Sequence, residues 1–192
     1  MTTVASITAA IEADAQNQAY TKAGLHPLFK VMPSATMLIL SQAPSRQAQA
    51  AMTFWHDPSG DRLRQWLGVS DEEFYHAGKI AVMPLDFYYP GKGGRGDLPP
   101  RKGFAEKWHP PLLALMPHLQ MTLLIGMYAQ KYYLGKRRQP TLTATVAHYQ
   151  DYLPEYFPLV HPSPLNYGWL HQHPWFEQEV VPDLQQRVRA LL

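Results

Sequence analysis

The chain has 192 residues, carries a formal net charge of +2, is 46% hydrophobic and contains no cysteine. This length and composition predict one globular domain over residues 1–192, with residues 1–34 as a helical extension packed on it. The absence of cysteine excludes disulfides, thiolate zinc sites, cysteine nucleophiles and cysteine-ligated iron–sulfur clusters.

Helical periodicity and short apolar runs alternate along the chain. Helices are expected, in chain order, over residues 5–23, from about residue 45, and over 61–68, 71–77, 104–116, 128–134, 142–153 and 176–192. Pro110 and Pro111 interrupt the helix expected over 104–116. Strands buried on both faces are expected over residues 36–40, 79–83, 121–125 and 156–160. This alternation predicts an α/β fold, a three-layer α/β/α sandwich with a four-stranded, mainly parallel central sheet.

The N-terminal residues lack the basic and apolar segments of a signal peptide, and no apolar run approaches the roughly 20 residues of a membrane span. We therefore expect a cytoplasmic, monomeric protein without a membrane partner. Its small net charge neither requires nor forbids a nucleic-acid partner, but cations cluster in residues 92–102 and 131–138. Either cluster is also compatible with an ordinary solvated surface.

Ligands bind at the carboxyl ends of the strands in sheets of this kind, which directs attention to the loops that follow them. The loop after the fourth strand begins His161-Pro162-Ser163-Pro164. Each proline fixes its own φ and pushes the preceding residue toward an extended conformation, so the loop should hold the imidazole of His161 in one place. A fixed imidazole suits the stabilisation of an anionic leaving group. A rigid loop with a solvent-facing histidine is the alternative.

Two further segments contain candidate binding residues. Phe54 and Trp55 lie in a segment bounded by glycine and proline, where they suit stacking on a planar ring or cover the core. In the long loop 84–103, Asp86 and two tyrosines precede four basic residues. That pattern is typical of a nucleic-acid surface or of a structured surface loop.

Metal and cofactor chemistry are not indicated by the sequence. The histidines at 109, 118, 171 and 173 do not have the spacing of a recognised zinc site. The glycines of loop 84–103 lack the Gly-Lys-Ser/Thr of a nucleotide-binding P-loop, and the chain has no Gly-x-Ser-x-Gly elbow of a serine hydrolase. We therefore expect no metal and no cofactor.

Taken together, these motifs resemble the uracil-DNA glycosylase superfamily over about residues 35–192. The first family motif reads Gly-Gln-Asp-Pro-Tyr or Gly-Glu-Ala-Pro-Gly, and it is matched here by Ser41-Gln42-Ala43-Pro44-Ser45. The phenylalanine that stacks on the base in that family is matched by Phe54, and its last motif, His-Pro-Ser-Pro, by residues 161–164. An aromatic segment and a long C-terminal helix then follow, as in the family.

The resemblance implies a monofunctional DNA glycosylase of base-excision repair. Such an enzyme flips uracil or another altered base out of single- or double-stranded DNA and hydrolyses its N-glycosidic bond. The implied catalytic residues are His161, Gln42 and Asp86; the implied base-binding residues are Phe54, Ala43, Met83 and Tyr88; the implied DNA-binding residues are Ser45, Arg46, Ser163, Pro164, Leu165, Asn166, Lys92 and Arg95. In this scheme His161 hydrogen-bonds the base oxygen as negative charge builds there, and Phe54 stacks on the base.

The chain also departs from the family pattern. The aspartate that some branches carry in the first motif is Ala43, and the asparagine that reads uracil on the second strand is matched by Met83. Asp86 would then replace the missing carboxylate, or read a base that presents hydrogen-bond donors. The lack of cysteine implies a member without an iron–sulfur cluster. Two alternatives stay open: a catalytically weak or inactive nucleic-acid-binding member of the same fold, and a hydrolase of free nucleosides or small nucleotides.

Overall fold

The computed structural model describes residues 2–94 and 96–192. The strands are β1 (Met37–Leu40), β2 (Ile80–Val82), β3 (Lys92–Gly93), β4 (Gly96–Asp97), β5 (Met121–Ile125) and β6 (Tyr156–Leu159). The α-helices are α1 (Val4–Ala13), α2 (Gln18–Lys22), α3 (Arg46–Ala51), α4 (Pro58–Leu67), α5 (Asp71–Tyr75), α6 (Phe104–Leu113), α7 (Gly126–Leu134), α8 (Leu142–Ala147), α9 (Tyr167–Gln172) and α10 (Val181–Leu191).

Four strands form the central sheet, in the order β2-β1-β5-β6. Every neighbouring pair in it is parallel, and Met37 of β1 lies opposite Ile80 of β2 and Met121 of β5. All four strands fall within the predicted apolar runs. Because parallel strands end at the same edge, the segments that follow β1, β2, β5 and β6 lie together. The predicted mainly parallel sheet is confirmed.

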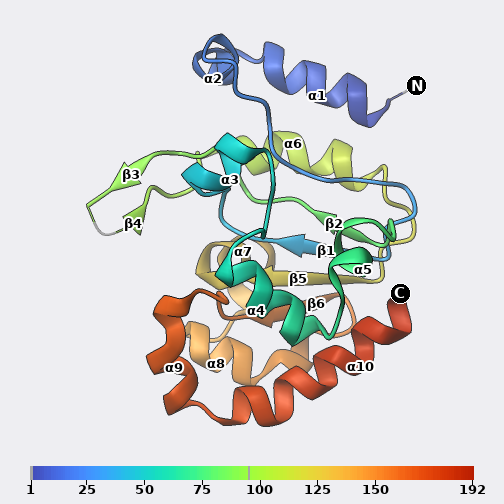
Figure 1. Ribbon diagram of the computed structural model, residues 1–192, viewed down its shortest axis with the longest axis vertical. Coiled ribbons are helices and arrows are strands. Elements are labelled where there is room, and N and C mark those ends of the chain that lie inside the picture. The colour runs from blue at the N-terminus through green and yellow to red at the C-terminus, as the bar shows by residue number, and fades with distance from the viewer. Residues whose placement is uncertain (1, 95) are drawn as a thin grey trace.

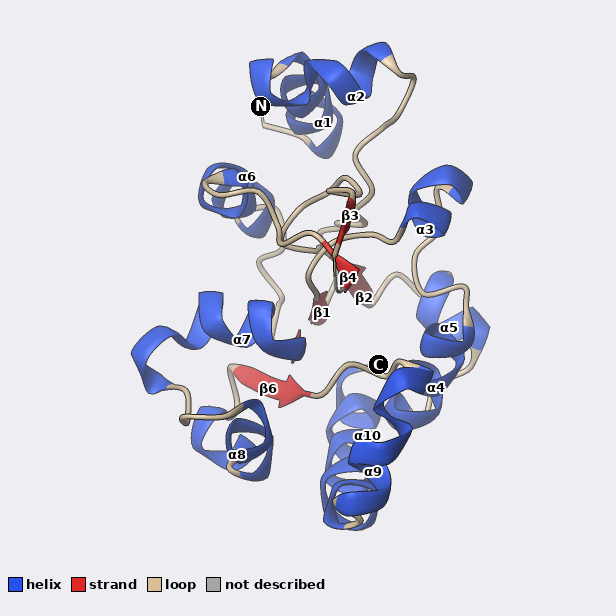
Figure 2. Ribbon diagram, turned by 90° about the vertical axis from the view of Figure 1, so that its left-hand side faces the viewer, coloured by secondary structure: helices blue, strands red, loops and turns tan. Residues whose placement is uncertain are grey.

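Helices cover both faces of the sheet (Figures 1 and 2). Met37 and Ile39 of β1 pack in one core with residues of α4, α5, α8 and α10. Leu38 and Leu40 pack in the second core with residues of α1, α6 and α7. Successive side chains of a strand point to opposite faces, and all four of these are fully buried, which explains the unbroken apolar run in the sequence. The predicted α/β/α sandwich is confirmed.

Three helix predictions need correction. The single helix expected over 5–23 ends at Ala13, because Asp14 is extended (ψ 134°) and its carboxylate accepts the N–H of Gln16 at 2.9 Å, which starts a separate 3-10 turn. The helix expected over 142–153 likewise ends at Ala147 and continues as a 3-10 turn. In contrast, α6 continues through both of its prolines, although each of them lacks the N–H of a helical hydrogen bond, and it ends two residues later.

The long loop after β2 begins in the core and continues into a hairpin that projects from the molecule. Its first aromatic residues, Phe87 and Tyr88, are fully buried. Further along, β3 and β4 pair antiparallel in a short hairpin that extends beyond the end of the sheet (Figure 1). The prediction that the tyrosine rings of this loop form a nucleic-acid surface is therefore wrong for Tyr88, whose ring contacts other side chains.

Candidate active site

A cavity of about 320 Å³ opens at the carboxyl ends of β1, β2 and β6. We call it the main cavity. It is lined by Leu28, Ser41, Gln42, Ala43, Pro44, Ser45, Ala48, Phe54, Trp55, Asp57, Ser59, Val82, Pro84, Asp97 and His161. Its volume is at the lower end of the range for small-ligand pockets, which suits a single planar base. It lies at the sheet edge that the fold class predicts for ligands.

His161 lies in this wall with one defined orientation. The N–H of Ser163 donates to its Nδ1 at 3.1 Å, and the side-chain amide of Asn166 donates to its carbonyl oxygen at 2.7 Å. Because Nδ1 accepts, the proton of the neutral imidazole is on Nε2, which remains available as a donor. Burial lowers the pKa of His161 below 6.5, and the charge of Asp57 opposes part of that shift. The histidine is therefore neutral at pH 7 and still has an N–H to donate.

The turn after β1 and the aromatic pair 54–55 form most of the remaining wall. Gln42 donates its side-chain amide to the carbonyl of Leu98 at 2.8 Å, which ties this turn to the loop after β2. The Ser45 side chain accepts the N–H of Ala48 and so begins α3. Phe54 and Trp55 are partly buried, and the Trp55 ring lies 5.5 Å from the ring of His161. Five of the predicted site residues thus meet at one cavity: Gln42, Ala43, Ser45, Phe54 and His161.

Asp86 does not line the main cavity. It is fully buried, and its two oxygens accept hydrogen bonds from Arg101 Nε at 2.7 Å, Arg101 Nη2 at 2.8 Å and the backbone N–H groups of Tyr88 and Arg101. With both oxygens engaged, the carboxylate has no free position for a base or a water. This geometry fits an internal ion pair, not the predicted catalytic role.

The two base-binding candidates on and after β2 are also away from the cavity. Met83 is fully buried in the core beneath α6, so its side chain offers nothing to a base at the position where the family has asparagine. Tyr88 is fully buried, with its ring stacked on Tyr20 at 4.5 Å. Val82 and Pro84 contact the cavity instead.

Of the described DNA-binding candidates, Ser45 lines the main cavity, and the others lie on adjoining segments. Leu165 is 94% exposed at the tip of the loop after β6, flanked by Pro164 and Asn166 in a 3-10 turn. Arg46 and Lys92 are exposed on a neighbouring concave surface that Ser45 also lines. Ser163 caps the turn by accepting the N–H of Leu165 at 3.2 Å. Arg95 lies outside the described residues.

A second cavity of about 300 Å³ lies on the other side of Gln42 and His161. Tyr128 at the start of α7, Asn166 after β6 and Trp169 of α9 contribute to its lining. Gln42 and His161 therefore separate two adjoining hollows at the same edge of the sheet.

Several residues of the site were missed by sequence reasoning. Arg62 of α4 donates to the carbonyl of Ser163 at 3.3 Å and lies over the ring of Tyr167, which joins α4 to the loop after β6. Asp57 lines the cavity and also caps α4. The cap could have been found from the sequence, because an aspartate is followed by Pro58 at the first helical position. No sequence pattern indicates the contacts of Arg62.

No cluster of three or more His, Asp or Glu side chains able to hold a metal occurs among residues 2–94 and 96–192. Within the same residues, every helix is too short or too polar to cross a membrane.

Comparison with protein-family models gives a match to the Uracil DNA glycosylase superfamily over residues 29–185. The match includes the sheet, the turn after β1, the Phe54 segment and the His161 loop. The resemblance read from the motifs is thereby confirmed, and the chain belongs to the uracil-DNA glycosylase superfamily.

Proposed function

We propose that the protein is a DNA glycosylase that hydrolyses the N-glycosidic bond of uracil or another altered base flipped out of DNA. The observation that carries the proposal is the orientation of His161: its Nδ1 accepts from Ser163, which leaves Nε2–H as a donor in the wall of a base-sized cavity. Phe54 in the same wall supplies an aromatic face for stacking.

The reaction requires a donor of this kind. As the glycosidic bond breaks, the base leaves with a negative charge and the sugar becomes cationic. A neutral imidazole that donates Nε2–H to the base oxygen stabilises the anion without transferring a proton, because it is fixed before the charge develops. The exposed Leu165 and the cations Arg46 and Lys92 near the opening suit contact with the DNA strand that carries the base.

The function is tested with oligonucleotides that contain one altered base. Single- and double-stranded substrates carrying uracil, hypoxanthine or xanthine are incubated with the protein, and abasic sites are then cleaved with alkali. We expect cleavage at one or more of these bases and none at the normal bases of the same strand. If all of these substrates survive a molar excess of protein, the protein is not a glycosylase of this class.

Asp57 is the carboxylate that we assign to the site in place of Asp86. It lines the main cavity, and its charge opposes part of the lowering of the His161 pKa by burial. A carboxylate in this position favours a cationic sugar and orients an attacking water. Asp97 also lines the cavity, but it faces Lys92 at 3.6 Å.

Asp57→Asn should lower the single-turnover excision rate roughly tenfold to a hundredfold, at the low end of the effects of acid–base groups. The fold should be retained, because asparagine caps a helix as well as aspartate does. Loss of the charge also lowers the pKa of His161 further, so the acid limb of the pH–rate profile should move to lower pH. Asp97→Asn is the comparison variant and should change the rate less. Equal effects of the two substitutions would contradict the assignment.

A protein that binds nucleic acid without turnover is the second candidate. Ala43 and the buried Met83 favour it, because two side chains that serve chemistry or base reading elsewhere in the family are missing. Salt-dependent binding of the same oligonucleotides without any cleavage would establish this alternative.

A further inference from the structure

The backbone of Trp55 has an unusual conformation in the wall of the main cavity. Its φ is +59°, in the left-handed region that side chains other than glycine rarely adopt. Strained residues of this kind persist only where their surroundings hold them, and they cluster at functional sites. The surroundings of Trp55 must therefore supply the contacts that hold it.

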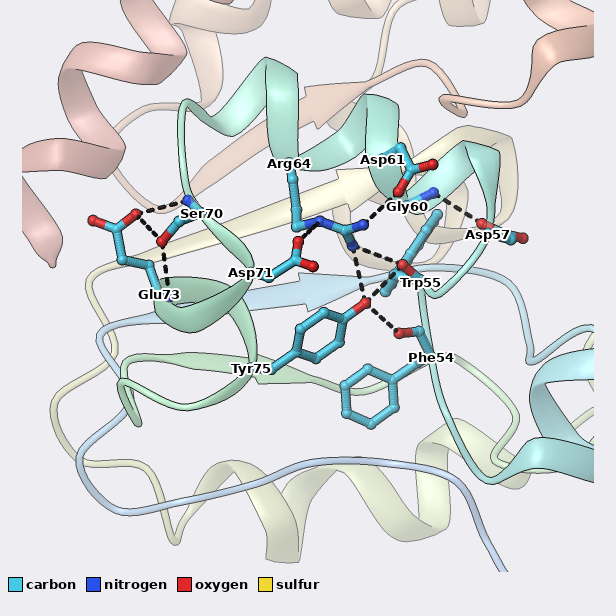
Figure 3. Close-up of polar contacts among 10 residues, drawn as sticks. All are labelled: Phe54, Trp55, Asp57, Gly60, Asp61, Arg64, Ser70, Asp71, Glu73 and Tyr75. Atoms are coloured by element: carbon cyan, nitrogen blue, oxygen red, sulfur yellow. Dashed lines mark hydrogen bonds and ion pairs between the residues drawn. The ribbon is translucent and has the colours of Figure 1, made fainter.

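Two side chains hold the carbonyl oxygen of Trp55 (Figure 3). Arg64 Nη1 from α4 donates to this oxygen at 2.8 Å, and the Tyr75 hydroxyl from α5 donates to it at 2.8 Å. Arg64 Nη1 also donates to the Tyr75 hydroxyl at 2.9 Å, and that hydroxyl lies 3.3 Å from the carbonyl of Phe54. One guanidinium and one phenol thus engage the main chain of both aromatic residues in the cavity wall.

Arg64 itself has a single orientation. It is almost fully buried, its Nε lies 2.6 Å from Asp71, and its Nη2 lies 2.6 Å from Asp61. Figure 3 shows the guanidinium between these two carboxylates with its remaining nitrogen directed at Trp55. The planar fork of arginine allows all of these contacts at once, which the point charge of a lysine does not.

The first turn of α4 completes this arrangement. A Cβ built on Gly60 would lie 1.6 Å from the carbonyl oxygen of Trp55, so that oxygen rests directly against the helix backbone. The N–H of Gly60 is bound by the Asp57 side chain at 2.8 Å, which fixes the same turn. The carbonyl of Trp55 is therefore held from α4 and α5, and its indole lies on the cavity side.

We propose that Arg64 and Tyr75 are positioning residues that hold Trp55 against the imidazole of His161. The two rings lie 5.5 Å apart at 36° and both line the main cavity. Neither Arg64 nor Tyr75 lines it, so both act through Trp55. The inference rests on the proposed function, in which His161 must keep Nε2–H directed at the base. The groups that face His161 are the Trp55 indole, the N–H of Ser163 and the charge of Asp57.

Tyr75→Phe tests the proposal because it removes the hydroxyl and keeps the ring. We expect the pKa of His161, measured from the pH dependence of its ring signals by NMR, to rise toward 6.5 as water reaches the imidazole. The single-turnover excision rate should fall about fivefold to tenfold, the usual cost of one lost hydrogen bond, with unchanged DNA affinity. Tyr152→Phe is the matched control, since the Tyr152 hydroxyl also donates to a carbonyl, that of Arg137 at 3.2 Å, outside the cavity.

A double-mutant cycle decides whether Tyr75 acts through Trp55. In a Trp55→Ala background, Tyr75→Phe should have no further effect on the pKa of His161 or on the rate. A Tyr75→Phe variant that behaves like Tyr152→Phe in the NMR titration, or effects that add in the double variant, would overturn the proposal. The titration needs no substrate, so it gives an answer even if the wild-type protein excises none of the tested bases.

Discussion

Replacing His161 with alanine should lower the single-turnover rate of base excision about 100- to 1,000-fold. A preorganised donor to a developing oxyanion contributes roughly 3 kcal/mol in the transition state, and the Nε2–H of His161 is the donor in the proposed mechanism. The affinity for DNA should change little, because the loss occurs in the transition state and not in the bound ground state. His148→Ala is the control: that histidine is exposed and lies outside the main cavity.

The pH dependence of the wild-type rate gives an independent check of the same mechanism. Protonation would place a proton on Nδ1, where the N–H of Ser163 already donates, so the neutral form is the active one. Burial lowers the pKa of His161 below 6.5, and the rate should therefore rise with pH below that value and be level from about pH 7. A rate that falls as pH rises through this range would instead identify His161 as a general acid.

A His161→Ala variant that keeps more than a tenth of the wild-type rate would contradict the proposed role of the imidazole.

The parts of the fold that the sequence predicts are those that depend on local patterns. Each strand of the central sheet is a short, largely apolar run of three to five residues, and because both of its faces are buried, the strand shows no alternation of polar and apolar residues. The breaks inside predicted helices were missed because they depend on single side chains. Asp14, for example, binds a main-chain N–H and ends α1 at a point where the apolar spacing continues.

The candidate site was predictable where a motif lies directly at a strand end. Gln42 follows β1 and His161 follows β6, so the topology of a parallel sheet brings them together. Asp86 was misplaced because its position after β2 is equally compatible with a side chain that points into the core. Its partner Arg101 is fifteen residues away across a loop, and no sequence pattern indicates that pairing. The Arg64–Tyr75–Trp55 contacts likewise depend on how α4 and α5 pack.

The ion pair of Asp86 gives the second large expected effect, which is on stability. Asp86→Asn should lower the free energy of unfolding by about 3 kcal/mol, because removing one partner of a buried pair leaves the other charge without compensation. Arg101 would keep its hydrogen bond to Asn17 at 2.8 Å and its place over the rings of Tyr20 and Phe104, but it would lose its only carboxylate among the described residues. Urea unfolding followed by fluorescence measures the change.

Glu155→Gln provides the matched control. Glu155 faces Arg137 at 3.9 Å with both side chains exposed, and pairs of this kind contribute about 0–1 kcal/mol. The excision rate of Asp86→Asn, measured at a temperature where the variant is fully folded, separates a structural role from a catalytic one. Because the N–H of Asp86 donates to the carbonyl of Gln42 at 3.2 Å, a small loss of rate through the adjacent turn is compatible with a structural role. A loss of a hundredfold or more in the excision rate of the folded variant would show that Asp86 is catalytic after all. A variant as stable and as active as the wild type would show that the buried pair contributes neither to stability nor to catalysis.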